Sequence, residues 1–299
     1  MHVISLPSDP GVGGRLASVM RCTHSRVWYK AFPDGELYLR LPSQVSEPII
    51  LVLTTYPEQN RSLMELLFAV EYFSFKGFKE LHVVAPYLAY SRQDKEFLEG
   101  EVVSGRALLR ILTDLGVRKL FVVDIHSDRL KEEFSDLVVN VAPARTFADY
   151  VRKTVKPPYI LLAPDVGASK RVETIAKLLE CNHVVVSKFR DRVTGEVTHR
   201  IPEEVNVRGI NVVIIDDIIS TGGTVVNLVE YLVRQGAGDV YVIASHGLFV
   251  GDALKRLSSS GVNRVVVLNT VNYRVSSGLV EYLDVTEEIL ESVRNTLEK

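Results

Sequence analysis

A turn suited to phosphate, with two carboxylates ahead of it, is the clearest chemical feature of this 299-residue chain. The apolar run 212–215 leads into Asp216 and Asp217, and the next turn opens a helix that we expect to begin near Val225. The first N–H groups of a helix bind anions, and glycines let the backbone approach them closely. Carboxylates repel phosphate but accept sugar hydroxyls or hold a metal ion. The turn contains Ser220, Thr221, Gly222, Gly223 and Thr224. We therefore predict a site for a phosphorylated sugar, although a strand-end cap with a tight turn is the plainer alternative.

The segment Phe-Pro-Asp-Gly-Glu at 32–36 combines an aromatic ring with acceptors. Phe32 offers a face on which a purine can stack, and Asp34 and Glu36 can accept from its amine or from a ribose. Taken alone, a Pro-Asp-Gly sequence with Gly35 is more typical of a turn between strands. The segment is thus a candidate nucleotide contact whose local pattern predicts a turn.

Two segments that follow apolar runs carry groups suited to a nucleotide. In Tyr-Ser-Arg-Gln-Asp-Lys at 90–95, Arg92 can fork onto phosphate oxygens and Gln93 can read an adenine edge. A solvated charged loop is the alternative. Asp-Ile-His-Ser at 124–127 follows the next run, and a lone histidine near a strand end, such as His126, is most often a hydrogen-bonded structural residue.

The second half of the chain has two more such segments. Residues 163–171 place Asp165 just before N–H groups that open a helix, an arrangement suited to a diphosphate. Residues 187–196 follow a strand and contain Lys188 and Arg190, with a Thr-Gly turn after them. The pattern alone favours a solvent-exposed hairpin for this charged segment.

The elements that must position these residues alternate as in an α/β protein. Several short runs are apolar throughout, which is typical of parallel strands buried on both faces, and amphipathic stretches of helical period separate them. This order predicts a mostly parallel sheet with right-handed crossovers. The expected strands are 49–53, 81–85, 120–123, 159–163, 183–186, 212–215, 240–244 and 265–268. The expected helices are 62–75, 104–115, 168–179, 224–234 and 285–297.

An internal echo favours two similar halves. Both 83–86 and 161–164 end in Ala-Pro after a strand, and 122–127 resembles the stretch from 214 onward. With a length of 299 residues, these echoes predict a duplicated domain. We expect domains at 1–142 and 143–299, with the last helix as a candidate for packing back onto the first domain.

Composition excludes several classes of protein. Thirty-five basic and 37 acidic residues give a net charge of −2, so no overall basic field attracts nucleic acid or acidic lipid. Cys22 and Cys181 are far apart and are expected to pack rather than to form a disulfide or a metal site. No signal peptide and no apolar run near the roughly 20 residues of a membrane span is evident. We expect a cytoplasmic protein.

The stretch around Asp216–Thr224 resembles the phosphoribosyl-binding signature of type I phosphoribosyltransferases and of ribose-phosphate diphosphokinases, the PRPP synthetases. The segments at 32–36, 90–95, 124–127 and 163–171 resemble, in order, motifs of the diphosphokinases. The chain departs from that pattern at Ser220, where the family often has an aspartate, and at Ala163 and Ala168. The resemblance implies two phosphoribosyltransferase-like domains.

It also implies an activity, namely transfer of the diphosphoryl group of ATP to ribose 5-phosphate, with PRPP and AMP as products. ATP would be held by Phe32, Asp34, Gly35, Glu36, Arg92 and Gln93. Ribose 5-phosphate would be held by Arg190, Asp216, Asp217, Ser220, Thr221, Gly222, Gly223 and Thr224. Mg²⁺ would be held by His126 and Asp165, and the catalytic cations would be Lys188 and Arg190. A homo-oligomer is expected, because in the family the segment 32–36 often reaches ATP across a subunit boundary.

Two alternatives stay open. A phosphoribosyltransferase that consumes PRPP would share the turn at 220–224 but has no evident use for 32–36 or 124–126. A non-catalytic nucleotide-binding regulator of the same fold is the other alternative, although such a protein has no need to keep Lys188 and Arg190.

Overall fold

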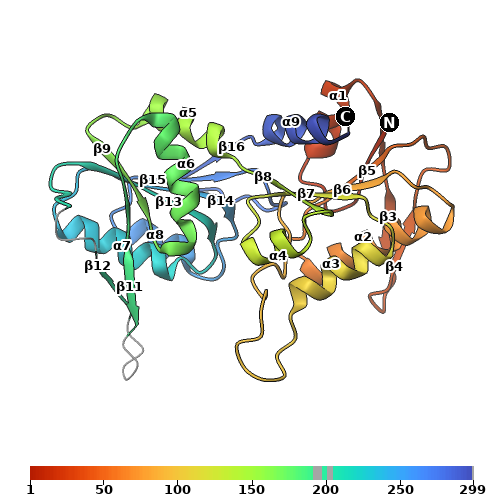
Figure 1. Cartoon of the computed structure of the whole chain (residues 1–299), viewed down its shortest axis with the longest axis horizontal. Helices are drawn as coiled ribbons and strands as arrows, with labels where there is room; N and C mark the ends of the chain where they lie inside the picture. Colours follow the sequence, from red (N-terminus) through yellow and green to blue (C-terminus); the bar gives the residue numbers. More distant parts are fainter. Residues whose placement is uncertain (191–196, 201–204, 298–299) are drawn as a thin grey trace. The chain divides into compact units, whose positions relative to one another are not determined.

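The chain folds into two compact units, which we describe separately (Figure 1). The structure, a computed structural model, describes residues 1–190, 197–200 and 205–297. One unit comprises Met1–Ala142, Thr270–Arg274 and Val285–Lys299, and the other comprises Pro143–Asn269 and Val275–Asp284. Each unit is built on a six-stranded, fully parallel sheet with helices on both faces. The predicted fold class, α/β with two similar and mostly parallel domains, is confirmed.

In the first unit the sheet is flanked by α1 and α9 on one face and by α2 and α3 on the other (Figure 1). In spatial order its strands are β2 (Thr23–Arg26), β1 (His2–Ser5), β5 (Ile49–Val52), β6 (Leu81–Val84), β7 (Lys119–Val123) and β8 (Val138–Val141). The helices are α1 (Val12–Met20), α2 (Gln59–Phe75), α3 (Ser104–Asp114), α4 (Asp128–Glu133) and α9 (Thr286–Leu297).

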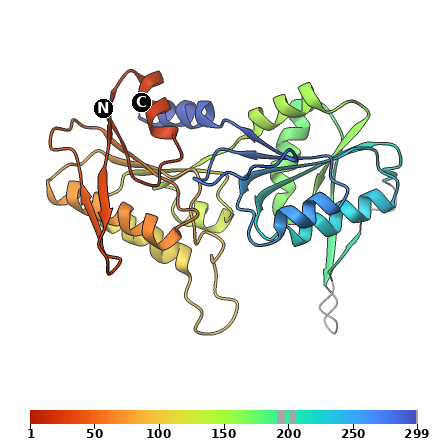
Figure 2. The same ribbon diagram turned by 180° about the vertical axis from the view of Figure 1, so that it is seen from behind.

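In the second unit α5 and α6 cover one face of the sheet and α7 and α8 the other, which Figure 2 shows from behind. In spatial order its strands are β10 (His183–Val185), β9 (Tyr159–Ala163), β13 (Asn211–Ile219), β14 (Val240–Gly247), β15 (Arg264–Leu268) and β16 (Val280–Leu283). The helices are α5 (Ala144–Thr154), the 3₁₀ turn η1 (Val166–Ala168), α6 (Ser169–Leu179), α7 (Gly223–Arg234) and α8 (Ala253–Ser259).

The two sheets have the same strand order. In each, the unit's first strand lies second from the edge, its second strand forms the edge, and the remaining four follow in sequence. An antiparallel hairpin is inserted at the same point in both units, after the edge strand. These hairpins are β3 (Trp28–Ala31) with β4 (Leu37–Arg40), and β11 (Ser187–Arg190) with β12 (Val197–Arg200).

The two internal sequence similarities noted above, however, match strands that do not occupy equivalent positions in the two sheets. β6 is the fourth strand along its sheet and β9 the second, and the other echo joined β7 to β13. A better marker lies where α1 and α6 end. Arg21 and Glu180 both have a left-handed φ of 52°, and in both units the next residue, Cys22 or Cys181, donates its N–H to the carbonyl five residues earlier at 3.1 Å. The equivalent of the phosphate-loop strand β13 is therefore β5.

The continuous apolar runs fold as predicted. Every residue of β1, β5 and β6 is buried, because helices cover both faces of the sheet. On one face of the first unit, Leu66, Val70 and Phe73 of α2 belong to the same core cluster as Ile49 and Leu51 of β5. In the second unit, α7 packs in the same way on alternate residues of β13. These two cores fix the strand ends at which the candidate residues lie.

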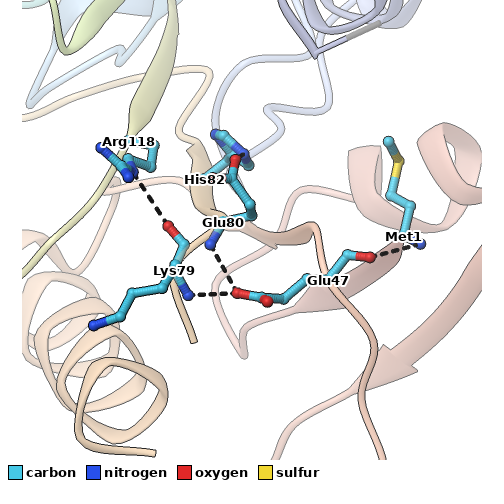
Figure 3. Close-up of polar contacts among 6 residues, drawn as sticks. All are labelled: Met1, Glu47, Lys79, Glu80, His82 and Arg118. Atoms are coloured by element: carbon cyan, nitrogen blue, oxygen red, sulfur yellow. Dashed lines mark hydrogen bonds and ion pairs between the residues drawn. The ribbon is translucent and has the colours of Figure 1, made fainter. Parts of the chain in front are cut away.

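At the amino end of the first sheet, one carboxylate joins several turns (Figure 3). Glu47 accepts the backbone N–H groups of Lys79 and Glu80, the latter at 2.8 Å, and these bonds lower the pKa of Glu47. Arg118 donates from Nε to the carbonyl of Lys79 at 3.3 Å. The loops at this end of the sheet are thus held by hydrogen bonds between side chains and backbone groups, and none of the candidate residues lies among them.

The end of the chain belongs to the first unit. Ile289, Leu290 and Val293 of α9 are buried, and the helix packs against α1, β7 and β8. Arg294 also donates to the carbonyl of Val19 on α1 at 3.4 Å. In the part of the chain that the structure describes, no helix has the length and apolar character needed to cross a membrane.

Candidate active site

The phosphate loop predicted at Ser220–Thr224 connects the carboxyl end of β13 to α7. Two details of the prediction are wrong. The strand continues to Ile219 instead of ending at the carboxylates, because β13 stays paired with β14 over that length. The helix begins at Gly223 rather than near Val225, and of the two glycines Gly222 alone has a positive φ, 72°. Gly222 is the N-cap, where a side chain would strain the backbone.

The carbonyl groups of the loop are engaged away from a ligand. The Ser220 carbonyl accepts the N–H of Val250 at 3.0 Å, and the Thr221 carbonyl accepts from the guanidinium of Arg256 on α8. The Gly222 carbonyl enters the first turn of α7. Because the carbonyls point to these donors, the N–H groups at the start of α7 are the ones suited to an anion. Sequence reasoning missed Arg256, whose link to the loop depends on the fold.

Asp216 and Asp217 are neighbours on β13, and Ile218 and Ile219 separate them from the loop. The N–H of Asp217 donates to Oδ1 of Asp216 at 2.9 Å, and Asp217 is buried. Burial raises the pKa of Asp216 to about 7, the negative charge of Asp217 adds to this rise, and the charge of Arg171 on α6 opposes it. A carboxyl group with a pKa near 7 is easily shifted toward its ionised form by partners that stabilise the negative charge, such as sugar hydroxyls or a cation.

Asp165 lies at the carboxyl end of β9, in front of η1 and α6. Its Oδ1 accepts the N–H of Ala168 at 3.2 Å, which makes it the cap of η1. Val166 is 79% exposed, so the turn faces solvent. The substituted residues Ala163 and Ala168 are buried and lie behind the turn. The turn therefore keeps both the carboxylate and the helix start on which the prediction of a diphosphate or metal contact depends.

Lys188 and Arg190 lie on β11 of the second hairpin, where Lys188 pairs with His199 and Arg190 with Val197. Residues 191–196, which include the predicted Thr-Gly turn at 194–195, lie outside the described residues. Residues 187–190 of the charged segment thus form a hairpin strand, as the pattern favoured. The role of the two cations in catalysis stays a prediction.

The segment 32–36 forms the turn of the first hairpin. The N–H of Phe32 donates to the carbonyl of Glu36 at 2.8 Å, Asp34 accepts the N–H of Glu36 at 3.1 Å, and Gly35 has a φ of 94°. Phe32 is 38% exposed, and Nζ of Lys30 lies over its ring, 4.4 Å from the centroid, in a cation–π contact. The turn is therefore well ordered by its own hydrogen bonds and presents an aromatic ring to solvent.

Arg92 and Gln93 lie in the loop that follows β6. Tyr90 has a positive φ of 67°, and the N–H of Gln93 donates to the Tyr90 carbonyl at 3.1 Å. Ser91 is buried and donates to the carbonyl of Leu88 at 3.0 Å, whereas the side chain of Arg92 is exposed. The tight turn thus buries Ser91 and leaves Arg92 at the surface.

His126 lies just after β7 and is exposed. The residues around it are firmly held: Asp124 has a positive φ of 47°, and the N–H of Ile125 donates to Oδ1 of Asn140 at 2.8 Å. Ser127 is 2% exposed and donates to Oδ2 of Asp94 at 2.6 Å. The structure therefore joins the His126 loop to the Arg92–Gln93 loop, a link that sequence reasoning missed.

The predicted residues are divided between the two units. The first unit holds 32–36, Arg92–Gln93 and His126, and the second holds Asp165, the β11 cations and the β13 loop. Among the described residues, no three His, Cys, Asp or Glu side chains form a group that could hold a metal ion. A metal bound by protein alone is thus not supported there, whereas one that shares its ligands with a nucleotide needs fewer protein groups.

Known proteins are similar to this chain over most of its length. Residues 1–116 match the family described as the N-terminal domain of ribose phosphate pyrophosphokinase, and residues 183–299 match the phosphoribosyl synthetase-associated domain. The chain is 37% identical to a ribose-phosphate pyrophosphokinase of Saccharolobus solfataricus, over 98% of this chain and 100% of that one. It is 38% identical to that of Pyrococcus abyssi, over 85% and 87%.

The fold also has a counterpart among solved structures. A phosphoribosylpyrophosphate synthetase from Mycobacterium smegmatis superposes with a TM-score of 0.89, covering 99% of both chains at 23% identity. That likeness supports the fold, and the more similar archaeal relatives decide the family. This chain belongs to the ribose-phosphate pyrophosphokinase family.

Proposed function

We propose that this protein transfers the diphosphoryl group of ATP to the anomeric hydroxyl of ribose 5-phosphate, releasing PRPP and AMP. The observation that carries the proposal is the end of β13, where the half-buried Asp216 and the buried Asp217 precede a loop of N–H groups, in a chain that spans its pyrophosphokinase relatives. In the reaction the anomeric oxygen bonds to the β-phosphorus, and the bond from that phosphorus to the α-phosphate oxygen breaks.

The second unit would bind the sugar phosphate. The amides and hydroxyls of Ser220–Thr224 would hold the 5-phosphate, and Asp216 and Asp217 would accept ribose hydroxyls. Ser220, which stands where the family often has an aspartate, adds no negative charge to this loop. A bound sugar would favour the ionised form of Asp216, whose pKa is raised to about 7 without it.

The first unit would bind ATP. Phe32 would stack on the base, with Asp34, Gly35 and Glu36 as polar contacts, while Arg92 and Gln93 would reach the phosphates and adenine. Exposed rings on the same hairpin, Trp28, Tyr29 and Tyr38, suit contact with a second copy of the chain, so we expect a homo-oligomer. Light scattering that shows an active monomer would contradict that expectation.

His126 and Asp165 would supply protein ligands to Mg²⁺ that arrives with the nucleotide. Such an ion commonly takes one or two protein ligands together with phosphate oxygens and waters, which fits two strand-end residues of which His126 is exposed and Asp165 is partly exposed. When bound, it neutralises charge on the phosphate chain. Lys188 and Arg190 would stabilise the negative charge that spreads over the moving diphosphoryl group. Positioning and charge supply most of the catalysis, since phosphoryl transfer needs little covalent help.

Product analysis with labelled ATP tests the proposal. With ribose 5-phosphate and Mg²⁺, we expect label in both the β and γ positions to move to PRPP, with AMP formed in equal amount. Release of ADP, or no transfer at all, would overturn the assignment. A base-exchange assay with PRPP addresses the phosphoribosyltransferase alternative, and ATP binding without AMP formation would identify a regulator.

A further inference from the structure

Ser127 links two segments of the first unit that are far apart in sequence, because its hydroxyl is hydrogen-bonded to both. Its hydroxyl accepts the N–H of Leu130 at 3.0 Å, which caps α4, and it donates to Oδ2 of Asp94 at 2.6 Å. It is 2% exposed, so the bond to Asp94 is largely shielded from water. A hydrogen bond to a carboxylate is among the stronger ones, and its length here is typical of that class. The residue just before Ser127 is His126.

Asp94 is the next residue after Gln93, in the loop expected to bind ATP. That loop is also held from α3, because the N–H of Gly105 donates to the Gln93 carbonyl at 3.1 Å. A Cβ at position 105 would lie 2.6 Å from Cδ1 of Leu130 and 2.9 Å from the Tyr90 carbonyl. The loop expected to bind ATP and the first turn of α4 therefore both pack against Gly105 of α3, where there is no space for a side chain.

We propose that Asp94 is a positioning residue, which fixes the His126 loop relative to Arg92 and Gln93 through its bond to Ser127. The proposal rests on the proposed function, since it concerns how the first unit presents its groups to a nucleotide. Capping of α4 by itself needs only an acceptor for Leu130, which Ser127 provides. The carboxylate adds a fixed orientation to that hydroxyl, and with it a fixed place for the neighbouring histidine.

Four variants separate positioning from simple stability. Asp94→Ala removes the acceptor, Asp94→Asn keeps an acceptor oxygen without the charge, and Ser127→Ala removes the donor together with the α4 cap. Asp114→Ala is the matched control, because it removes an exposed carboxylate of α3 whose ion pair with Arg110 spans 3.9 Å. For each, calorimetry would measure binding of ATP with Mg²⁺, and separately of ribose 5-phosphate. Thermal unfolding and steady-state rates would complete the set.

We expect Asp94→Ala and Ser127→Ala to weaken Mg²⁺-dependent ATP binding by roughly 10- to 100-fold, the range found when outer partners of metal ligands are removed. Ribose 5-phosphate binding should stay unchanged. Asp94→Asn should recover binding to within about threefold of wild type, since a neutral acceptor retains part of the bond. Asp114→Ala should behave as wild type in every assay.

An equal loss of affinity for both ligands in Asp94→Ala, or a lower unfolding temperature with unchanged ATP binding, would overturn the positioning role. So would an Asn variant as weak as the Ala variant. Absence of PRPP and AMP formation in the wild-type protein would count against the proposed function instead. The calorimetric comparison would still decide the role of Asp94 in that case.

Discussion

After β1 in the first unit, the carboxylate of Asp9 accepts the N–H groups of Gly11, Val12 and Gly13 at 2.9 to 3.3 Å, and so occupies the start of α1. After β9, the equivalent strand of the second unit, Asp165 accepts the N–H of Ala168, within a turn that faces solvent. The Asp9 carboxylate of the first unit thus caps three N–H groups of its turn, whereas Asp165 caps the N–H of Ala168 in the turn that we propose as a ligand contact.

The ends of β5 and β13 differ in the same way. In the first unit, Thr54 and Thr55 are fully buried, and their hydroxyls donate to the carbonyls of Thr270 and Tyr87 at 2.7 and 2.9 Å. In the second, the equivalent position leads into the loop with exposed Thr221. The comparison teaches that the same strand order can end in turns closed by protein groups, as in the first unit, or in turns that reach solvent, as in the second, where we propose the anion contacts.

The largest expected effect comes from the second hairpin. Lys188→Ala should lower kcat by about 10³-fold or more, because a cation would be lost where negative charge spreads in the transition state. Ribose 5-phosphate binding, measured by calorimetry, should persist. Lys177→Ala, which breaks an exposed ion pair with Glu173 on α6, is the control and should keep full activity. Wild-type turnover in Lys188→Ala would refute its assignment.

The two capping aspartates sharpen the comparison directly. Asp165→Ala should reduce kcat/KM by roughly 100-fold, while thermal stability falls little, because that carboxylate has one recorded backbone partner here. Asp9→Ala should do the reverse, lowering the free energy of unfolding by about 1 to 2 kcal/mol with activity kept. Rates and denaturant unfolding measure both quantities. If Asp9→Ala abolished activity without destabilising the protein, the assigned difference between the two turns would be wrong.

Two glycine N-caps provide a matched pair of smaller effect. Gly11 and Gly222 precede α1 and α7 with φ of 95° and 72°, so an alanine at either position strains the backbone by about 1 to 2 kcal/mol. We expect Gly222→Ala to weaken ribose 5-phosphate binding by roughly tenfold or more, since the loop amides would shift. Gly11→Ala should leave that affinity unchanged. Similar binding losses in both variants would show that strain alone is responsible.

The smallest effect is on stability and concerns Asp216. Because its folded pKa of about 7 lies above its unfolded value of 3.8, the stability it contributes is full below pH 4 and is lost as pH rises to 7. Asp216→Asn should therefore raise the unfolding temperature of the ligand-free protein at pH 8, by a few degrees, and have little effect near pH 4. It should also weaken sugar binding at pH 8. An unchanged pH dependence of unfolding would contradict the raised pKa.

The sequence predicted the core better than the edges. Runs such as 159–163 were correctly predicted because a strand buried on both faces must be apolar throughout. The edge strand β2 (Thr-His-Ser-Arg) and the exposed strand β3 of the first hairpin carry no such signal. Helix α8 was missed because seven residues are too few for a clear helical period.

Candidate residues within one motif were also predictable, since their spacing along the chain carries the chemistry. Hydrogen bonds between residues far apart in the sequence could not be predicted in this way. The bonds from Ser127 to Asp94 and from Arg256 to Thr221 join residues 33 and 35 positions apart, and they exist because strand order brings those loops together. The misplaced echoes have the same cause, because strand ends of similar composition recur at different places in a parallel sheet.

The assignment of α9 to the first unit has a consequence for how the chain is made. The polypeptide leaves that unit after Ala142, returns for five residues at Thr270–Arg274, and returns for good only at Val285. All six strands of the second unit's sheet precede α9 in the chain, so they are synthesised before the helix that covers β7 and β8. A fragment ending at Ala142 would therefore keep α1 but leave the apolar surface of β7 and β8 without that helix, and we expect it to aggregate.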